Sequence, residues 1–416
     1  MEKLVVFVYL PNEVVAVPAG IFKYDPQERV GYFSYGRLYL ERHAFQISPD
    51  LPLNATEKIT RKCGGLFGTF RDSSPDYWGR TVFAALNKRP FESIAEHEFL
   101  LEASATRIGN LDFRLSLDSP EPILTLPDFS SLDDLLQAFD DINDGKDVPE
   151  SYRLLLLDGT SMGGMRPKCT VEDDNSLWIA KFPAKGDRYN VAKIEAATMM
   201  LAKKAGIRTP EIKIASAGEK DIFLIERFDR AFDITKNGYT RQGFASGLSL
   251  LGKDETERGF GYADFAEQLR RSSDTKGAKE LFKRMVFNIA VRNTDDHGRN
   301  HGFILSDSDY VLSPAYDITP SPSREGLSTS FDLAINVGVE GRFASITNAL
   351  SEYQRFGISY EQALILINDV KDAVLDFKAV FDQFDISEAD RQRFGYTFER
   401  ACERLSLESD ELDLRL

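Results

Sequence analysis

Cysteine and histidine are scarce in this sequence of 416 residues. The three cysteines lie far apart, without any C-x-x-C pair, at Cys63, Cys169 and Cys402. This pattern gives no indication of a disulfide framework or a zinc site, and it fits a reducing compartment. Two of the four histidines, His297 and His301, have the spacing of helical metal ligands, but glycines at 298 and 302 disfavour a continuous helix there.

Long hydrophobic runs are absent as well. No segment approaches the ~20 apolar residues that a membrane-spanning helix requires. The opening sequence MEKLVVFVYL predicts a strand and not a signal peptide. With 42% hydrophobic and 28% charged residues, the composition is that of an ordinary soluble globular protein. We therefore expect a cytoplasmic protein with no membrane contact.

Positive charge is in deficit. The sequence has 51 lysines and arginines against 66 aspartates and glutamates, which gives a net charge of −15. Contact with nucleic-acid phosphates needs clustered lysine and arginine, so this balance disfavours a nucleic-acid-binding surface. Any role on DNA is expected to come through a basic partner.

A chain of this length is expected to form two or three domains. Alternating apolar residues predict an N-terminal α/β unit with strands at Leu4–Leu10, Val14–Phe22 and Val30–Tyr35. The apolar spacing of Leu132–Phe139 predicts an amphipathic helix, and the aspartate-rich run Asp140–Glu150 predicts a linker. The predicted boundary separates an N-terminal α/β domain, residues 1–148, from a second domain, residues 149–416.

One polar stretch of the second domain has the pattern of a catalytic loop. In Phe287–Phe303 an apolar helix end is followed by a turn rich in carboxylates and amides. Phosphoryl transfer needs a carboxylate that accepts a hydroxyl proton and an amide oxygen about five residues on for the metal ion, as Asp295 and Asn300 provide. Asp317, after an apolar strand-like run, supplies a second acid as metal ligand. Each acid alone would suit a solvated turn or a helix cap; the ordered set favours catalysis.

A glycine-rich segment precedes this loop by more than a hundred residues. Gly163 and Gly164 would let backbone N–H groups approach an anion, and Arg166 and Lys168 add positive charge beside them. The segment lacks the Walker A spacing and is weak evidence by itself.

A strand lysine and a helix glutamate strengthen the pattern. Lys181 lies on the predicted strand Leu177–Pro183, and Glu195 lies on the predicted helix that follows. Protein kinases use such a pair to hold nucleotide phosphates. A snorkelling edge lysine and a surface glutamate are the alternative. After the next strand, the backbone of Glu226–Phe228 could bind an adenine as an interlobe hinge does.

The remaining sequence is largely helical, with amphipathic patterns at Leu281–Ile289, Tyr360–Val374 and Ala389–Leu405. The predicted fold class is therefore α+β: an N-terminal α/β domain, then a two-lobed protein-kinase-like domain. Its phosphate-binding lobe is expected at 149–228 and its helix-rich catalytic lobe at 229–416.

Five ordered motifs resemble the HipA family of serine/threonine kinases, which are toxins of bacterial toxin–antitoxin modules. They are SMGGMRPK at 161–168, IAKFP at 179–183, ERFDR at 226–230, NTDDHGRN at 293–300 and SPAYD at 313–317. Residues Leu66–Arg80 also resemble the family's N-terminal domain.

The resemblance implies a role for each matching residue. Asp295 would be the catalytic base, with Asn300 and Asp317 as Mg²⁺ ligands and Lys181 as the phosphate lysine. The ATP site would comprise Met162, Gly163, Gly164, Met165, Arg166, Lys168, Lys181, Glu195, Glu226, Arg227, Phe228, His297, Asn300, Tyr316 and Asp317. Ser161 matches the serine that family members autophosphorylate to switch themselves off.

The resemblance also implies partners. A small HipB-like helix-turn-helix antitoxin would neutralise the chain and carry it to operator DNA. The protein substrate would be a translation component such as an aminoacyl-tRNA synthetase. Asp296 departs from the glycine expected here, and its charge beside the base leaves the substrate preference open. A small-molecule kinase of the same fold and a catalytically silent scaffold for antitoxin and DNA are the alternatives.

Overall fold

The computed structural model describes residues 1–42, 45–102, 105–122, 124, 126–146, 156, 166–306, 308–323 and 330–406. They divide into two compact units. The first unit comprises Met1–Gly186, Glu211–Glu255 and Ile304–Asp309, and the second comprises Asp187–Pro210, Thr256–Phe303 and Tyr310–Leu416. Because the chain passes between them several times, neither unit is one continuous piece of sequence.

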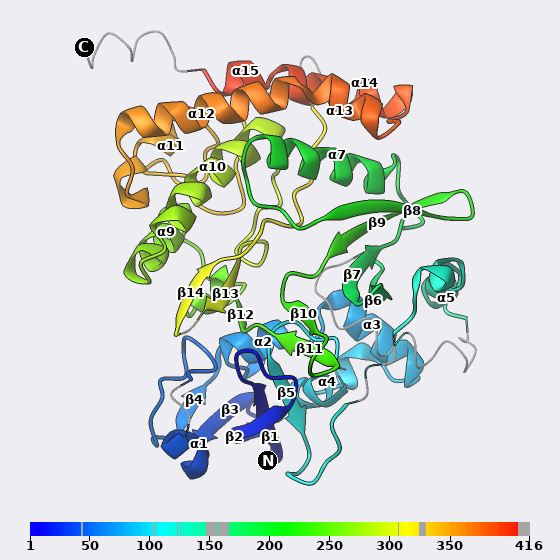
Figure 1. Cartoon of the computed structure of the whole chain (residues 1–416), viewed down its shortest axis with the longest axis vertical. Helices are drawn as coiled ribbons and strands as arrows, with labels where there is room; N and C mark the ends of the chain where they lie inside the picture. Colours follow the sequence, from blue (N-terminus) through cyan, green and yellow to red (C-terminus); the bar gives the residue numbers. More distant parts are fainter. Residues whose placement is uncertain are drawn as a thin grey trace. The chain divides into compact units, whose positions relative to one another are not determined.

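The first unit begins with a five-stranded antiparallel sheet in the order β4-β3-β2-β1-β5 (Figure 1). Its strands are β1 Glu2–Tyr9, β2 Ala16–Asp25, β3 Val30–Tyr35, β4 Lys58–Thr60 and β5 Leu111–Arg114. The three strands predicted first in the sequence are thus confirmed. Phe70, on the short helix α2 (Gly68–Ser73), contacts the rings of Phe22, Phe33 and Phe113 edge to face at 5.3, 5.7 and 5.0 Å. This aromatic cluster forms the core on one face of the sheet.

A second antiparallel sheet of the first unit has the order β6-β7-β9-β8. Its strands are β6 Lys168–Asp173, β7 Ser176–Lys181, β8 Ile212–Ala217 and β9 Lys220–Glu226. Trp78 and Phe139 pack into the core of this sheet at 5.3 Å from each other, although both precede the predicted boundary at residue 148. The boundary itself falls outside the described residues and stays a prediction.

The remaining elements of the first unit are short. They are α1 Arg37–Arg42, α2 Gly68–Ser73, α3 Tyr77–Leu86, α4 Glu96–Glu102, α5 Leu132–Asn143, α8 Gly247–Leu250, β10 Arg230–Asp233, β11 Gly238–Arg241 and β12 Phe244–Ser246, with 3-10 turns at Lys62–Gly64, Phe91–Ser93 and Phe129–Ser131. The prediction of a linker at Asp140–Glu150 was wrong for its first residues, because α5 extends to Asn143. Ile142 continues the apolar stripe of Leu135 and Phe139 and is buried with them, which makes the extra turn of helix favourable.

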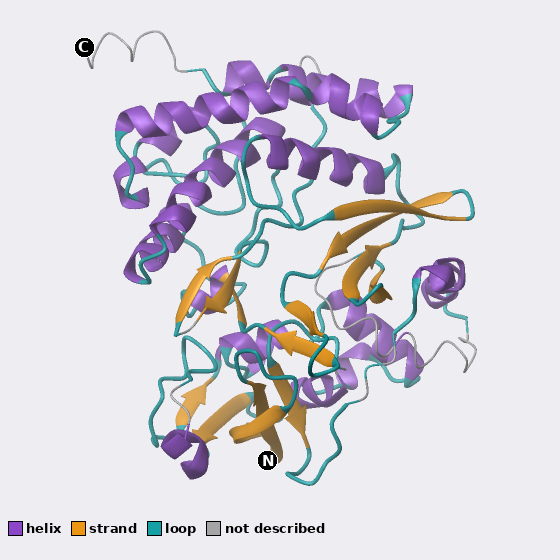
Figure 2. Cartoon of the chain, viewed as in Figure 1, coloured by secondary structure: helices purple, strands orange, loops and turns teal. Residues whose placement is uncertain are grey.

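The second unit is helical (Figure 2). Its helices are α7 Val191–Lys204, α9 Tyr262–Arg271, α10 Thr275–Val291, α11 Ile346–Leu350, α12 Tyr360–Leu375, α13 Phe377–Gln383, α14 Glu388–Glu399 and α15 Ala401–Arg404, with a 3-10 turn at Tyr353–Phe356. α10 packs against α9, α12 and α15, and its second half is almost wholly buried. The single helix predicted for Ala389–Leu405 is in fact two, because α14 ends before Arg400.

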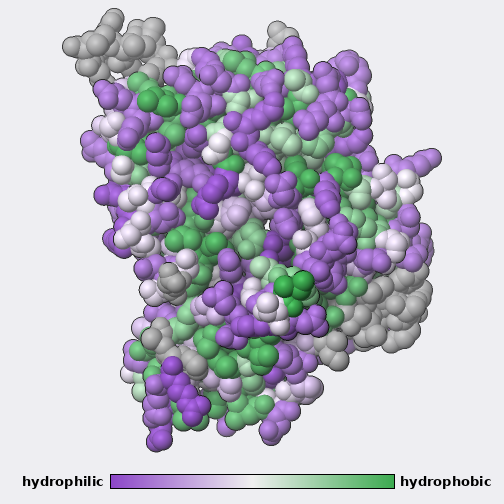
Figure 3. All heavy atoms as spheres, viewed as in Figure 1, coloured by the Kyte–Doolittle hydropathy of each residue, from purple (hydrophilic) through white to green (hydrophobic). Residues whose placement is uncertain are grey.

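The end of α7 has the residues typical of a helix C-terminus. Lys203 and Lys204 occupy its last turn, and Gly206 follows with a φ of +75°. This left-handed conformation suits glycine, which has no Cβ to clash. Among the described residues, no helix is both long enough and apolar enough to cross a membrane. On the face that Figure 3 shows, hydrophobic residues lie in small groups among hydrophilic ones.

Candidate functional site

The predicted catalytic loop follows directly from the end of α10. Arg292 stops the helix by adopting a left-handed conformation with φ 56°, and the N–H group of Asn293 donates to the carbonyl of Asn288 at 2.9 Å. The chain then turns outward, so that Asp295 and His297 are exposed while Asp296 between them is buried. A buried helix thereby holds an exposed polar loop at a fixed position.

Asp295 has the accessibility that a proton acceptor needs. Its side chain is 78% exposed, and its backbone N–H group donates to the side-chain oxygen of Asn293 at 3.3 Å. Crowding by neighbouring protein atoms raises the pKa of its carboxyl group; His297, 4.0 Å away, opposes this, and the charge of Asp317 adds to it. A carboxylate with a raised pKa is a stronger base than an ordinary surface aspartate.

Asn300 is oriented by the same loop. Its side-chain Nδ2 donates to the carbonyl oxygen of Asp295 at 2.7 Å, and its backbone N–H group donates to the carbonyl of His297 at 2.8 Å. Since this network assigns the amide nitrogen to Asp295, the Oδ1 atom is left for another partner. Amide and carboxylate oxygens are the ligands that Mg²⁺ prefers, so Asn300 and Asp317 together suit this ion.

Asp317 follows β14 (Asp309–Leu312), the second strand of a hairpin with β13 (Gly302–Ser306). Its φ of 57° is left-handed, a conformation that aspartate tolerates better than most residues. Four hydrogen bonds tie its segment to the catalytic loop: Ser313 N to Gly302 O at 3.0 Å, Tyr316 Oη to Arg299 O at 2.8 Å, Ser321 N to Arg292 O at 3.0 Å, and the hydroxyls of Thr294 and Ser321 at 2.8 Å. The second unit thereby gathers Asp295, Asn300 and Asp317 in one place.

The two histidines of the loop differ. His297 is half exposed beside Asp295, whereas His301 is buried and donates from Nε2 to the carbonyl of Asp296 at 3.1 Å. Burial lowers the pKa of His301 to about 3, so its ring is neutral and has a structural role. Within the described part of the chain, no group of three or more histidine, cysteine or acidic side chains could hold a metal ion.

The side chain of Asp296 is buried, and its charge still interacts with that of Asp295, as the sequence had led us to expect. Its side chain is 1% exposed and accepts hydrogen bonds from the Tyr262 hydroxyl and from the N–H group of Ala334 at 2.6 Å. Burial raises the pKa of Asp296 to about 6, although both hydrogen bonds oppose the shift. The adjacent acid is therefore an internal anchor of the loop.

The lysines that the sequence predicts to bind phosphates lie in the first unit. Lys168 on β6 stands directly opposite Lys181 on β7, and Lys181 lies 5.6 Å from the centre of the Phe223 ring. Glu195 belongs to the other unit, where it is buried on α7. Its pairing with Lys181 stays a prediction.

Part of the predicted adenine hinge is hydrogen-bonded within the protein. The N–H groups of Glu226 and Arg227 donate to the carbonyls of Glu211 and Leu177 at 2.9 and 2.7 Å. The guanidinium of Arg227 is fully buried in hydrogen bonds to Asp229 and to the carbonyls of residues 106 and 107. These contacts occupy the N–H groups of Glu226 and Arg227, and the binding of adenine at the hinge stays a prediction. Ser161 and the predicted loop residues Met162, Gly163, Gly164 and Met165 lie outside the described residues; Arg166 lies just before β6.

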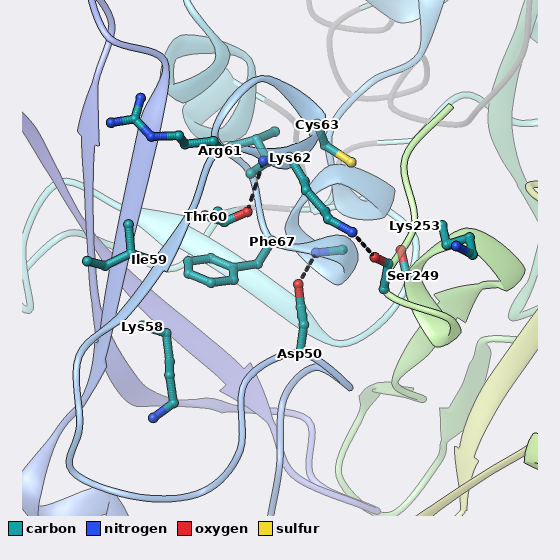
Figure 4. A pocket seen from close by; sticks show the side chains of 13 residues that line it. Asp50, Lys58, Ile59, Thr60, Arg61, Lys62, Cys63, Phe67, Ser249 and Lys253 are labelled. Carbon is teal, nitrogen blue, oxygen red and sulfur yellow. Dashed lines mark hydrogen bonds between the residues drawn. The ribbon is translucent and has the colours of Figure 1, made fainter. Parts of the chain in front are cut away.

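A pocket of about 550 Å³ lies elsewhere in the first unit (Figure 4). Residues 58–63, 66–68, 249, 252, 253 and Asp50 line it, and it contains none of the predicted site residues. Lys62 donates to the carbonyl of Gly252 at 2.5 Å, and Lys58 donates to Asn54 at 2.6 Å. Asp50 accepts from the N–H group of Gly68 at 3.0 Å. Several polar groups that line the pocket thus form hydrogen bonds within the protein.

Sequence patterns missed the residues that assemble the loop. A hydrogen bond between Thr294 and Ser321 joins the loop of Asp295 to the segment of Asp317. The Tyr262 hydroxyl, which accepts from Asn288, donates to Asp296. Their partners are 26 to 34 positions away along the chain. No local spacing could have shown these pairs.

Sequence comparison shows proteins that are similar to this chain. The model of the HipA-like C-terminal domain matches residues 160–377, and that of the HipA N-terminal domain matches residues 13–114. The serine/threonine-protein kinase toxin HipA of Shewanella oneidensis is 23% identical over 220 residues, 45% of this chain and 50% of that protein. The Sinorhizobium fredii protein Y4mE is 27% identical over 164 residues, 38% of this chain and 37% of its own. The matched region thus spans half or less of these relatives.

A solved structure extends the likeness to almost the whole chain. HipA in the Shewanella oneidensis complex of HipA, HipB and operator DNA has a TM-score of 0.65 and 16% identity, over 96% of both chains. At this identity the match shows the fold alone, an α+β fold with a two-lobed kinase-like domain. The first family model by itself covers more than half of the 416 residues. The chain therefore belongs to the HipA family.

Proposed function

We propose that the chain is an ATP- and Mg²⁺-dependent serine/threonine protein kinase that serves as the toxin of a toxin–antitoxin module. The observation that carries the proposal is the assembly of Asp295, Asn300 and Asp317 by four hydrogen bonds between two segments of the second unit. A silent scaffold would have no use for an exposed base beside two oriented metal ligands. The proposed domain division, 1–148 and 149–416, is that of the sequence.

Each residue has one task in the proposed reaction. Asp295 accepts the proton of the attacking hydroxyl, because its carboxylate is exposed and its pKa is raised. Asn300 and Asp317 would hold Mg²⁺, which neutralises charge on the phosphates when it is bound. Lys168 and Lys181 offer paired positive charge to the same phosphates. The protein contributes positioning and charge neutralisation without a covalent intermediate.

Transfer from radiolabelled ATP tests the proposal. The purified chain is incubated with Mg²⁺ and a bacterial lysate, and in parallel with aminoglycosides or sugars. We expect label in one or a few proteins, among which a translation component such as an aminoacyl-tRNA synthetase is the proposed substrate. Label only in the small molecules would indicate a small-molecule kinase. No transfer to any acceptor, with intact folding, would leave the scaffold as the function.

The proposed partner is a basic, DNA-binding, HipB-like antitoxin. The HipA of the solved complex assembles with HipB and operator DNA, and a net charge of −15 suits a basic partner. We expect the isolated chain to bind duplex DNA poorly at physiological salt, because phosphate binding needs clustered cations. A gel-shift titration at several salt concentrations checks this. Tight, salt-sensitive binding by the chain alone would contradict it.

Ser161 is proposed as the site of self-inhibition. A phosphate there would add about −1.5 to −2 charges to the segment proposed to hold the phosphates of ATP. We expect mass spectrometry to find phosphate on Ser161 after incubation with ATP and Mg²⁺, together with lost ATP affinity. The phosphate should be absent from Asp295→Asn, and Ser161→Ala should stay active and bind ATP. An unmodified Ser161 in protein that phosphorylates other substrates would exclude this switch.

A further inference from the structure

The buried carboxylate of Asp296 ends a chain of side-chain hydrogen bonds that begins at the base itself. The N–H group of Asp295 donates to Asn293 Oδ1 at 3.3 Å, and Asn293 Nδ2 donates to Asn288 Oδ1 at 3.1 Å. Asn288 Nδ2 then donates to the Tyr262 hydroxyl at 2.7 Å, and that hydroxyl donates to Asp296 Oδ2. Since Asp296 follows Asp295 in sequence, this series of hydrogen bonds and the peptide bond between the two residues form a closed ring.

The four side chains that close this ring are shielded from water. Asn288, Asn293 and Tyr262 are at most 4% exposed, and Asp296 is 1% exposed. Buried polar networks are stable only when each member has its partners, and then they hold one geometry. All the hydrogen bonds of the ring run in the same order from donor to acceptor. The last acceptor is the carboxylate of Asp296, which can only accept. Reversing any one amide would break two hydrogen bonds.

Asp296 also connects the loop to two other parts of the second unit. Its Oδ1 atom accepts from the N–H group of Ala334, and its carbonyl accepts from the ring of His301. Tyr262, at the start of α9, donates from its N–H group to the carbonyl of Asn336 at 3.1 Å. Asp296 is therefore held by hydrogen bonds from α9, from segment 331–344 and from His301 at the end of the loop.

We propose that Asp296, with Tyr262, is the positioning pair for the base: it holds the Asp295 carboxylate at the angle required for proton abstraction without touching substrate or nucleotide. The inference rests on the proposed function and assigns a role to a residue where the family resemblance led us to expect glycine. Glycine at 296 could not accept these side-chain hydrogen bonds. The backbone of the loop would then be held by fewer contacts.

The decisive variant is Tyr262→Phe, which removes one hydroxyl and keeps the ring that packs against His301 at 5.0 Å. We expect the single-turnover rate of phosphoryl transfer to fall about 10- to 100-fold, because a small misplacement of a catalytic group has effects of this size. ATP affinity, measured by calorimetry, should stay within about twofold, since the metal ligands and lysines are untouched. Asp296→Ala should show the same division between rate and affinity.

Tyr239→Phe is the matched control. Its hydroxyl also donates to a carboxylate, that of Glu172, but both residues lie in the first unit and outside the proposed site. We expect it to leave the transfer rate unchanged. A rate for Tyr262→Phe within about threefold of wild type would overturn the proposal. So would a loss of ATP affinity as large as the loss of rate, because that result indicates general disruption of the unit.

A second measurement does not depend on activity. Amide hydrogen exchange over residues 293–300 should become faster in Tyr262→Phe and Asp296→Ala, with no change in α7 or α12. If the wild type transfers phosphate to no acceptor, the proposed function fails, and exchange alone decides the positioning inference. Faster exchange confined to the loop would support it, and unchanged exchange would overturn it.

Discussion

Replacement of Asp295 or Asp317 by asparagine is expected to lower the rate of phosphoryl transfer by about 10³-fold or more, above ~4 kcal/mol in the barrier. Asparagine at 295 cannot accept a proton at neutral pH, and asparagine at 317 removes the charged ligand of the proposed metal. Each side chain lies on a segment whose backbone is held by other residues, so the fold should remain intact.

The measurement is transfer from radiolabelled ATP in single-turnover conditions, with thermal unfolding as a check on the fold. Asp309→Asn is a suitable control, because Asp309 is an exposed acid of β14 outside the proposed site. Its rate should equal that of wild type. Retention of even a tenth of the wild-type rate in Asp295→Asn or Asp317→Asn would rule out the assigned roles.

Local features of the chain could be predicted from the sequence, whereas the roles of the site residues stay predictions. The spacing of Asp295 and Asn300 on one turn allows the hydrogen bond between them, which depends only on residues five apart. The end of α7 before Gly206 was predictable for the same reason, since a helix end is decided within one or two turns. Turns and helix ends that short segments determine can thus be inferred from short segments.

Contacts between distant segments could not be predicted. Asp296 differs from Asp295 only in which way its side chain turns, and that depends on Tyr262 and Ala334. The adenine hinge Glu226–Phe228 stays a prediction. The contacts of Arg227, Asp229 and Arg230 with residues about 120 positions earlier could not be read from the sequence.

Those contacts explain why the first unit crosses the predicted domain boundary. Asp229 accepts from the N–H group of Gly109 at 2.9 Å, while Arg227 and Arg230 both donate to Asp229 and to carbonyls of residues 106–109. The carboxylate and both guanidinium groups are at most 3% exposed. A buried ionic cluster therefore joins segments that the sequence had assigned to different domains.

Asp229→Ala is expected to destabilise the first unit by about 3–5 kcal/mol, since it leaves two buried guanidinium groups without their counter-ion. For a unit of this size the loss corresponds to a fall in Tm on the order of 10 °C. Differential scanning calorimetry measures it. Asp173→Ala is the control, because its partly exposed ion pair with Lys213 at 2.9 Å should contribute at most about 1 kcal/mol.

The same cluster predicts a dependence on pH. Burial alone would raise the pKa of Asp229, but the charges of Arg227 and Arg230 and the hydrogen bonds from Arg227 and Gly109 lower it to about 2. In the unfolded chain the carboxyl group of Asp229 has a pKa of about 3.9. The stabilisation is therefore complete above that pH and is lost as the pH falls from about 4 through 2. Wild-type stability should therefore decrease over this range more steeply than that of Asp229→Asn, whose amide does not titrate. Parallel curves for the two proteins, or a loss in Asp229→Ala no larger than in Asp173→Ala, would show that the ionic cluster does not stabilise the unit. The segments would then be joined mainly by the apolar contacts of Trp78 and Phe139 with the second sheet.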